Sequence, residues 1–169
     1  MRKANLRRAA ASSGFTLIEI LVVLVILGLA AGLAFAELGE PHRRHAEREA
    51  RRLASALEHA AASAQWRGET LGVSAEGRGY RFWRRATDDR WLAMSDDDVL
   101  APRTLPTDVT VAPMSFAGAP VPADAILPFR ASGRNEPYAL LLVTPSWQIV
   151  LAADPLNRVQ VAAAPAASR

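Results

Sequence analysis

The chain has 169 residues, no cysteine and a formal net charge of +3. Without cysteines it has neither a disulfide nor a thiolate metal ligand, so its domain must be stabilised by core packing. The length suffices for one modest domain with a long helix and excludes two independent cores. Four of the 20 Lys and Arg residues and none of the 17 Asp and Glu residues lie in the first 14 positions, so 16 basic side chains face 17 acidic ones in the remainder. That remainder lacks the global basic charge of a nucleic-acid-binding domain.

A basic N-terminal segment, residues 1–14, precedes a long apolar run. From Phe15 to Ala36 the run contains one charged residue, Glu19. A helix rises about 1.5 Å per residue, so this run is long enough to cover the roughly 30 Å hydrocarbon core of a bilayer. We therefore predict a single transmembrane helix over residues 15–38. The basic segment predicts that residues 1–14 are cytoplasmic and that the chain after the helix lies across the membrane.

Glu19 is the unusual residue of this run. A charged side chain at mid-membrane costs about 2.5–3.5 kcal/mol on insertion scales. If the chain were cut between Gly14 and Phe15, the new amino group would lie one helical turn from Glu19, or near Glu19 of a neighbouring chain, and would offset that cost. A shallow position within reach of the headgroups would also reduce it. The residue alone does not separate these two interpretations.

The basic leader, Gly14 and the sequence Phe15-Thr16-Leu17-Ile18-Glu19 resemble the class III signal of type IV pilins and of the pseudopilins of type II secretion. The resemblance implies that a prepilin peptidase in the bacterial inner membrane cleaves after Gly14 and methylates Phe15. It also implies that Glu19, the fifth residue of the mature chain, takes part in assembly. An ordinary secretory signal fits less well, because its apolar core is shorter and is followed by its cleavage site; Ala34-Phe35-Ala36 resembles such a site.

Gly28 and Gly32 lie four residues apart in the apolar run, with alanines close by. Small residues at this spacing allow two helices to approach closely. Glycine is also common in membrane helices in general. The pair alone therefore does not distinguish a helix-packing face from the ordinary composition of such helices. The resemblance implies that such helices bundle in the core of a filament.

Pro41 predicts a kink or a restart of the helix. Beyond it, apolar residues recur at intervals of three and four and predict an amphipathic helix over residues 41–67, which ends before Gly68. The apolar face expected to be buried comprises Ala46, Ala50, Leu53, Leu57, Ala60 or Ala61, and Ala64.

Residues 70–161 alternate short extended runs with clusters of Gly, Pro and Asp. Strands are predicted at residues 71–75, 80–84, 90–94, 109–114, 126–129, 138–143, 147–151 and 158–161. Recurrent prolines leave no room for a second long helix, so we predict an α+β fold, with the long helix packed on an antiparallel β-domain. The small side chains of residues 162–169 predict a flexible tail.

The later segments are similar to the H-type minor pseudopilins of type II secretion. This similarity rests on the helix end at Arg67-Gly68-Glu69, on the segment from Ile126 to Leu140 and on residues 147–151. Two positions depart from the pattern. Arg130-Ala131-Ser132 replaces the usual proline and aspartate before the glycine, and Asn157 replaces a glycine before the final strand.

The resemblance implies a structural subunit at or near the tip of a periplasmic pseudopilus, which supports export of folded proteins across the outer membrane. It implies a single-pass protein of the inner membrane with a periplasmic C-terminal domain. The implied partners are other minor pseudopilins, the major pseudopilin, the prepilin peptidase and the inner-membrane assembly platform; secreted substrates are left open, and nucleic acid is not expected. No enzymatic activity, cofactor or metal is implied.

Patterns that carry chemistry are scarce in this sequence. His42 and His45 are three residues apart but have no third ligand nearby in the sequence. Asp96-Asp97-Asp98 has the oxygen ligands that calcium prefers but not the alternation and glycine turn of an EF-hand, so we expect a solvated turn there.

Two alternative functions are retained. A minor type IV pilin of pilus assembly or DNA uptake would need a basic, salt-sensitive surface. A plain membrane-anchored periplasmic domain would need no filament, and its chain would start at Met1 or after Ala36. The residues that could form the basic surface are Arg78, Arg81, Arg84, Arg85 and Arg90.

Overall fold

The computed structural model describes residues 17–166, except for the side chains of residues 32–42. The chain divides into two units, residues 1–38 and residues 39–169. The predicted cleavage and methylation positions, Gly14 and Phe15, lie outside the described residues, as does the proposed leader.

One long helix, α1 (Leu17–Arg67), precedes all the strands. The sequence predicted a kink or a restart at Pro41, but α1 continues through this proline, so a restart there is wrong. The physical reason is that proline fixes φ near −65°, which is a helical value, so a helix can continue through it at the cost of one hydrogen bond and a clash with the preceding turn.

The second half of α1 is amphipathic, as predicted. Ala46, Ala50, Leu53, Leu57 and Ala64 are completely buried. The helix ends at Arg67, and the next residue, Gly68, has φ of +67°, a conformation that glycine adopts without steric cost. The N–H of Glu69 donates to the carbonyl of Ala64 at 3.1 Å and so satisfies one of the last carbonyls of the helix.

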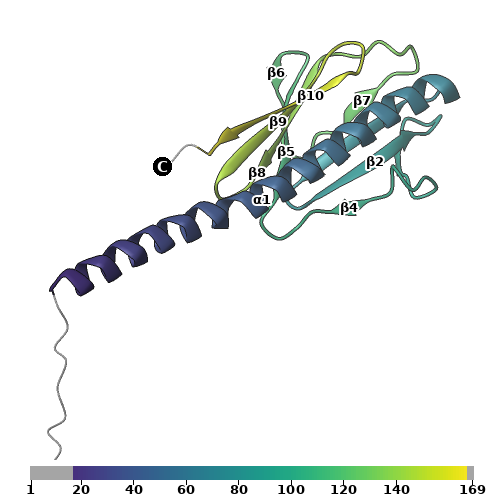
Figure 1. Ribbon diagram of the computed structural model, residues 1–169. Coiled ribbons are helices and arrows are strands. Elements are labelled where there is room, and N and C mark those ends of the chain that lie inside the picture. Colours follow the sequence, from purple (N-terminus) through teal and green to yellow (C-terminus); the bar gives the residue numbers. More distant parts are fainter. Residues whose placement is uncertain (1–16, 167–169) are drawn as a thin grey trace, which may run out of the picture. The chain divides into compact units, whose positions relative to one another are not determined.

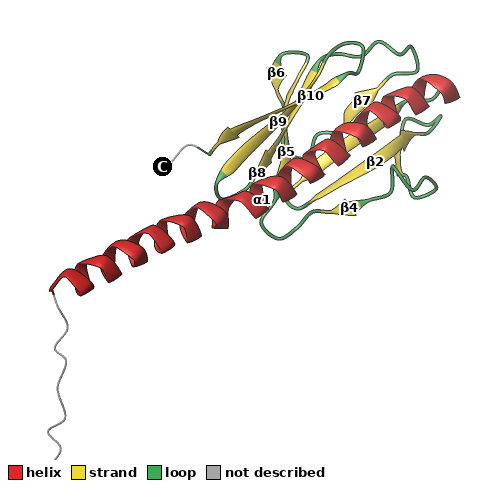
Figure 2. Cartoon of the chain, viewed as in Figure 1, coloured by secondary structure: helices red, strands yellow, loops and turns green. Residues whose placement is uncertain are grey.

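The strands form two antiparallel sheets (Figures 1 and 2). The first sheet has the order β3-β2-β1-β7, and β4 also pairs with β2. Its strands are β1 (Leu71–Glu76), β2 (Gly79–Arg85), β3 (Trp91–Ala93), β4 (Arg103–Thr104) and β7 (Leu127–Phe129). The second sheet has the order β10-β9-β8-β5-β6. Its strands are β5 (Thr110–Phe116), β6 (Ala119–Pro120), β8 (Tyr138–Val143), β9 (Trp147–Ala153) and β10 (Val159–Pro165).

All eight predicted strands exist, and the α+β class is confirmed. The sequence missed β4 and β6, which have two residues each. The predicted flexible tail 162–169 is wrong as far as Pro165, because β10 continues to that residue and pairs with β9 along its whole length. Alanine has a low strand propensity, but the backbone N–H and C=O groups of β9 supply partners regardless of side-chain type.

The core lies between the helix and the inner faces of the two sheets. In the long inner strands alternate residues point inward; in β8 these are Tyr138, Leu140 and Leu142. A link outside the core joins the final hairpin to the helix, since the N–H of Val159 donates to Oε1 of Glu58 at 2.9 Å. The part of α1 after residue 38, both sheets and the last strand therefore belong to one unit.

Candidate assembly site

The first half of α1 has an apolar surface that no described residue covers. Every residue from 17 to 31 is exposed, and Leu17, Leu24 and Leu29 are each at least 64% exposed. A continuous apolar surface of this size is stable only when lipid or other apolar side chains cover it. This half of the helix is therefore a surface for assembly or for anchoring.

Of the predicted site residues on this segment, Glu19 lies in the first turn of α1, where a negative charge is favourable to the helix dipole. A Cβ atom added at Gly28 would meet no atom within 4 Å. Gly28 is thus open to a neighbouring helix, whereas Gly32 lies among the residues whose side chains are not described. The roles of Gly14, Phe15, Glu19, Gly28 and Gly32 stay predictions.

Among the described residues, no helix combines the length and the apolar character needed to cross a membrane. The predicted transmembrane helix 15–38 extends beyond the described side chains at both ends and stays a prediction.

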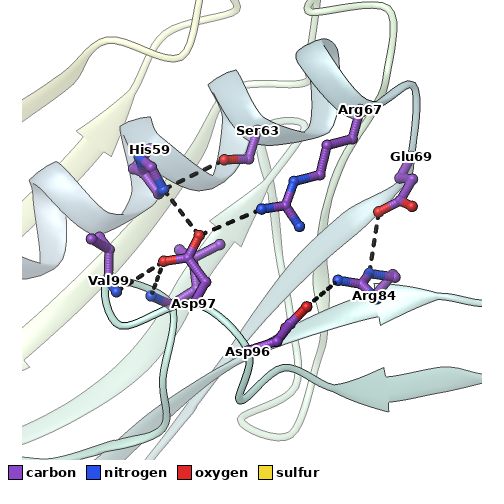
Figure 3. A network of polar contacts seen from close by, with 9 residues as sticks. His59, Ser63, Arg67, Glu69, Arg84, Asp96, Asp97 and Val99 are labelled. Atoms are coloured by element: carbon purple, nitrogen blue, oxygen red, sulfur yellow. Dashed lines mark hydrogen bonds and ion pairs between the residues drawn. The ribbon is translucent and has the colours of Figure 1, made fainter.

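The C-terminal end of α1 holds the loop after β3 through a polar network (Figure 3). Asp97 is at its centre. Its Oδ2 lies 3.3 Å from Nε2 of His59 and 3.7 Å from Nη2 of Arg67, both on α1. Its Oδ1 accepts hydrogen bonds from the N–H groups of Val99 at 2.9 Å and Leu100 at 3.3 Å. One carboxylate therefore fixes the loop to the helix and caps the following turn.

The pKa of Asp97 reflects these contacts. Partial burial opposes ionisation of its carboxyl group, but the hydrogen bonds from His59, Val99 and Leu100 together outweigh burial and lower the pKa. The carboxylate is therefore the form present at neutral pH.

In the same region, Arg84 pairs with two other carboxylate groups. Arg84 of β2 donates through Nη2 to Oδ2 of Asp96 at 2.9 Å, and its Nε lies 3.1 Å from Oε2 of Glu69 (Figure 3). The Asp96–Asp98 run forms a turn, as predicted, but Asp97 is not solvated, because only 13% of its side chain is exposed. Asp96 and Asp97 both face cationic groups of the chain, an arrangement that disfavours calcium there.

A bidentate ion pair joins the middle of α1 to β4. Nε and Nη2 of Arg103 each lie 3.0 Å from an oxygen of Glu49. The hydrogen bond from Arg103 lowers the pKa of Glu49, although burial opposes this effect. The Glu49–Arg103 pair and the Asp97 network therefore attach residues 94–104 to α1 at two positions along the helix.

The arginines suggested for a nucleic-acid surface mostly have other partners. Arg85 lies 3.1 Å from Asp89, and Arg90 lies 2.6 Å from Asp88. Arg84 pairs with Asp96, and Arg81 stacks on the ring of Trp83 at 5.4 Å. The carboxylates beside Arg84, Arg85 and Arg90 lower the net positive charge of this surface, so these arginines do not favour the DNA-uptake alternative.

Two family models match the chain. Residues 10–35 match the prokaryotic N-terminal methylation motif, and residues 49–164 match the family of the type II transport protein GspH. The second match covers more than half of the chain. The chain belongs to the GspH family.

This GspH-family chain is 33% identical over 102 residues to the type II secretion system protein H of Aeromonas hydrophila. That match covers 59% of the chain and 56% of the relative, so the chain spans little more than half the length of the curated relative.

Solved structures of GspH-type proteins share the fold. Two structures of the minor pseudopilin EpsH from the type II secretion system of Vibrio cholerae have TM-scores of 0.57 and 0.58, with 21% and 19% identity. They match 70% and 75% of this chain and 97% and 98% of their own chains. The solution structure of E. coli GspH has a TM-score of 0.50 and 18% identity, and the match covers 70% of this chain and 88% of that one. At these identities the likeness shows the fold, and the predicted pilin-like α+β architecture is confirmed.

The structure accounts for the departure from the GspH-family pattern at Asn157. Asn157 has φ of +64°, a conformation that glycine adopts freely and asparagine tolerates better than most residues. Its Nδ2 donates to the carbonyl of Gly133 at 3.0 Å. Asn157 therefore adopts the backbone conformation of a glycine and adds a side-chain hydrogen bond to the loop before β8. Sequence reasoning missed this hydrogen bond.

Proposed function

We propose that this GspH-family chain is a minor pseudopilin at or near the tip of the type II secretion pseudopilus. In this role it supports export of folded proteins from the periplasm across the outer membrane. One observation supports the proposal most strongly: the methylation motif at residues 10–35 overlaps an exposed apolar helix, and that helix leads into a domain with the fold of the pseudopilins.

The proposal includes maturation at the inner membrane. Residues 1–14 are cytoplasmic and are removed by a prepilin peptidase, which then methylates Phe15. Residues 15–38 anchor the chain in the membrane as a single span before assembly, and the β-domain is periplasmic. The exposed surface of residues 17–31 supports this step, because lipid covers such a surface without any rearrangement of the folded domain.

The proposal assigns assembly to the apolar half of α1. Glu19 pairs with the methylated amino group of a neighbouring subunit, which offsets the cost of a carboxylate among apolar helices. Gly28 and Gly32 allow close helix packing, and the open space around Gly28 supports this role. Other minor pseudopilins, the major pseudopilin and the inner-membrane assembly platform are the proposed partners.

Two measurements on the full-length protein in its native cell test the proposal. Mass spectrometry of the mature N-terminus is expected to find methylated Phe15; a start at Met1 or after Ala36 would refute the pilin-type maturation. Glu19→Ala is expected to leave cleavage intact but to reduce recovery in sheared pseudopilus fractions at least about tenfold, with Glu19→Asp as the charge-conserving control. Normal incorporation of Glu19→Ala would contradict the pairing role.

A secretion assay then distinguishes a role in the pseudopilus from that of a plain membrane-anchored domain. Deletion of the gene is expected to leave cargo of the type II system in the periplasm, and the wild-type chain is expected to restore its export. Unchanged export in the deletion strain would exclude the proposed role.

A further inference from the structure

Strand β10 forms an edge of the second sheet and pairs with β9 on one side only. In an antiparallel pair, the main-chain N–H and C=O groups of one residue point to the neighbouring strand, and those of the next residue point away from it. Every second residue of β10 therefore directs its main-chain polar groups away from β9. The hydrogen bonds at the two ends of the strand show which residues these are.

The residues that bond toward β9 are the even-numbered ones. Before the strand, the N–H of Asp154 donates to the carbonyl of Arg158 at 3.1 Å, and after it the N–H of Ala166 donates to the carbonyl of Ser146 at 2.9 Å. Residues 158 and 166 therefore have the same orientation, and the pairing of β10 with β9 between them has no register shift. The odd-numbered residues of β10 consequently direct their N–H and C=O groups outward.

Both ends of this outward row are closed. The N–H of Val159 already donates to Oε1 of Glu58 at 2.9 Å, and Pro165 has no N–H. Two outward donors remain, the N–H groups of Val161 and Ala163, and no described residue accepts a hydrogen bond from either. These two residues are about 6.8 Å apart, which is the two-residue repeat of a strand. Another extended main chain presents donors and acceptors at the same repeat, so the free row is complementary to a further strand.

The other sheet edges in the described part of the chain offer no comparable row. β3, β4, β6 and β7 have two or three residues each. Natural edge strands are kept from pairing with other chains by shortness, charged side chains, prolines or bulges. β10 has seven residues, no charged side chain and no bulge, and its proline is its last residue. β10 is therefore the described edge that an additional strand can use.

The side chains beside this row are apolar and uncovered. Val161 and Ala163 lie opposite Leu151 and Ile149 of β9, which are buried, so the side chains of these β10 residues are on the core side of the sheet. Val161 is nevertheless 37% exposed, and Ala163 is exposed as well. An added strand with apolar side chains at alternate positions would cover both.

We propose that residues 160–164 of β10 bind an extended segment of another protein, which adds to the second sheet as a further strand. The main chain of the segment exchanges hydrogen bonds with Val161 and Ala163. Its apolar side chains, at alternate positions, cover the exposed core side of β10. The free main-chain groups select an extended polypeptide, and the side chains beside them select its alternating apolar pattern.

A second copy of this chain does not fit the edge. Two copies of β10 would pair antiparallel, through a two-fold axis perpendicular to the joined sheet. That axis reverses the direction of a helix lying on the sheet, so the two α1 helices would run in opposite directions. Two chains anchored in one membrane by the N-terminal parts of these helices cannot adopt this arrangement. The exclusion of a second copy rests on the proposed membrane anchor, whereas the open edge does not.

The test uses the full-length chain in detergent micelles and the peptide acetyl-Thr-Val-Thr-Val-Thr-Val-amide, which is uncharged and favours strands. NMR follows hydrogen exchange of single amides. Without the peptide, Val161 and Ala163 should exchange at least about tenfold faster than Gln160 and Ala162, which bond to β9. A saturating amount of peptide should slow exchange at Val161 and Ala163 at least about tenfold. The same peptide with every amide N–H methylated keeps the side chains but has no donors, and it should have no effect.

Two variants at one position test the outward N–H itself. Ala163→Pro removes this donor but no hydrogen bond of the fold, because an edge strand tolerates proline where the missing N–H faces solvent. It should leave the thermal midpoint unchanged and remove at least about nine tenths of the protection that the peptide gives to Val161. Ala163→Ser keeps the N–H and should respond to the peptide like wild type.

Four results would each overturn the proposal. They are no protection by the peptide, equal protection by the methylated peptide, full protection of Val161 in Ala163→Pro, and a dimer in which Val161 and Ala163 are protected without any peptide. The last result would assign the edge to a second copy of the chain.

Discussion

Asn135 donates from Nδ2 to Oδ1 of Asn157 at a distance of 2.6 Å, across 22 residues of sequence. Asn135 also accepts the N–H of Arg130 at 2.7 Å through Oδ1 and is almost completely buried. The pair therefore connects the loop before β8 to the turn before β10. Because a buried amide without partners is unfavourable, this connection contributes to the stability of that end of the domain.

The first prediction concerns Asn157. Asn157→Ala loses two side-chain hydrogen bonds and places a β-carbon at φ of +64° without asparagine's tolerance of that conformation. We expect a loss of about 2–3 kcal/mol in the free energy of unfolding, measured by chemical denaturation with tryptophan fluorescence. Asn157→Gly removes the same hydrogen bonds but introduces no backbone strain. Its loss of unfolding free energy should therefore be about 1 kcal/mol smaller than that of Asn157→Ala. Equal losses would show that strain is unimportant at this position.

The second prediction concerns the pH dependence of the Glu49–Arg103 pair. The pKa of Glu49 is lowered in the folded chain by its hydrogen bond with Arg103. The pair therefore stabilises the fold above the pKa of an unfolded glutamate, about 4.3, and this stabilisation is lost as the pH falls through the folded pKa. Between pH 7 and pH 3, the difference in unfolding free energy between wild type and Glu49→Gln should shrink from about 2 kcal/mol toward zero. A difference that is constant with pH would contradict this role.

The third prediction tests Asp97 as the centre of the loop network. Asp97→Ala leaves the N–H of Val99 without its side-chain acceptor, removes one of the two acceptors of the Leu100 N–H, and removes the contacts with His59 and Arg67. The free energy of unfolding should fall by about 2–3 kcal/mol. Asp98→Ala, at the exposed neighbour, should change it by less than about 0.5 kcal/mol. Similar effects for the two variants would mean that the aspartate run acts only through its total charge.

The fourth prediction concerns a close contact in the first sheet. A Cβ atom at Gly72 would lie 2.7 Å from Cγ2 of Ile126 and 3.0 Å from the ring of Trp91. Gly72→Ala should therefore lower the thermal midpoint, at a cost of about 1–3 kcal/mol from overpacking. Gly79→Ala is the matched control, since its Cβ would make only an ordinary contact of 3.4 Å with the carbonyl of Arg103. If both variants are equally stable, Ile126 and Trp91 must move without cost.

The fifth prediction separates folding from assembly at Gly28. The Cβ of a leucine at this position would meet no atom of the described residues within 4 Å, so the thermal midpoint of the β-domain should not change. If Gly28 is the close-packing position of the helix, Gly28→Leu should reduce incorporation into the filament several-fold, and Gly28→Ala should have a smaller effect. Incorporation equal to wild type would show that the glycine spacing reflects composition alone.

Periodicity in the sequence was sufficient for the main elements. The three-and-four spacing from Ala46 to Ala64 predicted the buried helix face, and the short apolar run of residues 138–143 predicted a strand whose bounds are confirmed. The same reasoning missed β4 and β6, because two residues cannot show a period. It also ended β10 too early, since an alanine-rich strand depends on its partner β9 and not on its own propensity.

The polar contacts were less accessible to sequence reasoning. Three consecutive aspartates suggested a solvated turn, and nothing in the run indicated that Asp97 is the one that packs on α1. Arg103 and Glu49 are 54 residues apart, so their pairing is decided by the tertiary fold. At Asn157 a signal was present but was not used, because a glycine expected at that position can indicate a left-handed backbone.

The contact between Glu58 and Val159 has a consequence for the order in which the domain is completed. The acceptor is on the first element of the domain and the donor is on the last, 101 residues later. Strands β8 and β9, whose buried side chains share the core with those of the helix, likewise lie near the end of the sequence. A contact with so large a sequence separation forms late and slowly. The buried face of the helix is therefore completed only when almost the entire polypeptide has been synthesised, and a chain that stalls before its final hairpin would leave part of that apolar face open to chaperones and proteases.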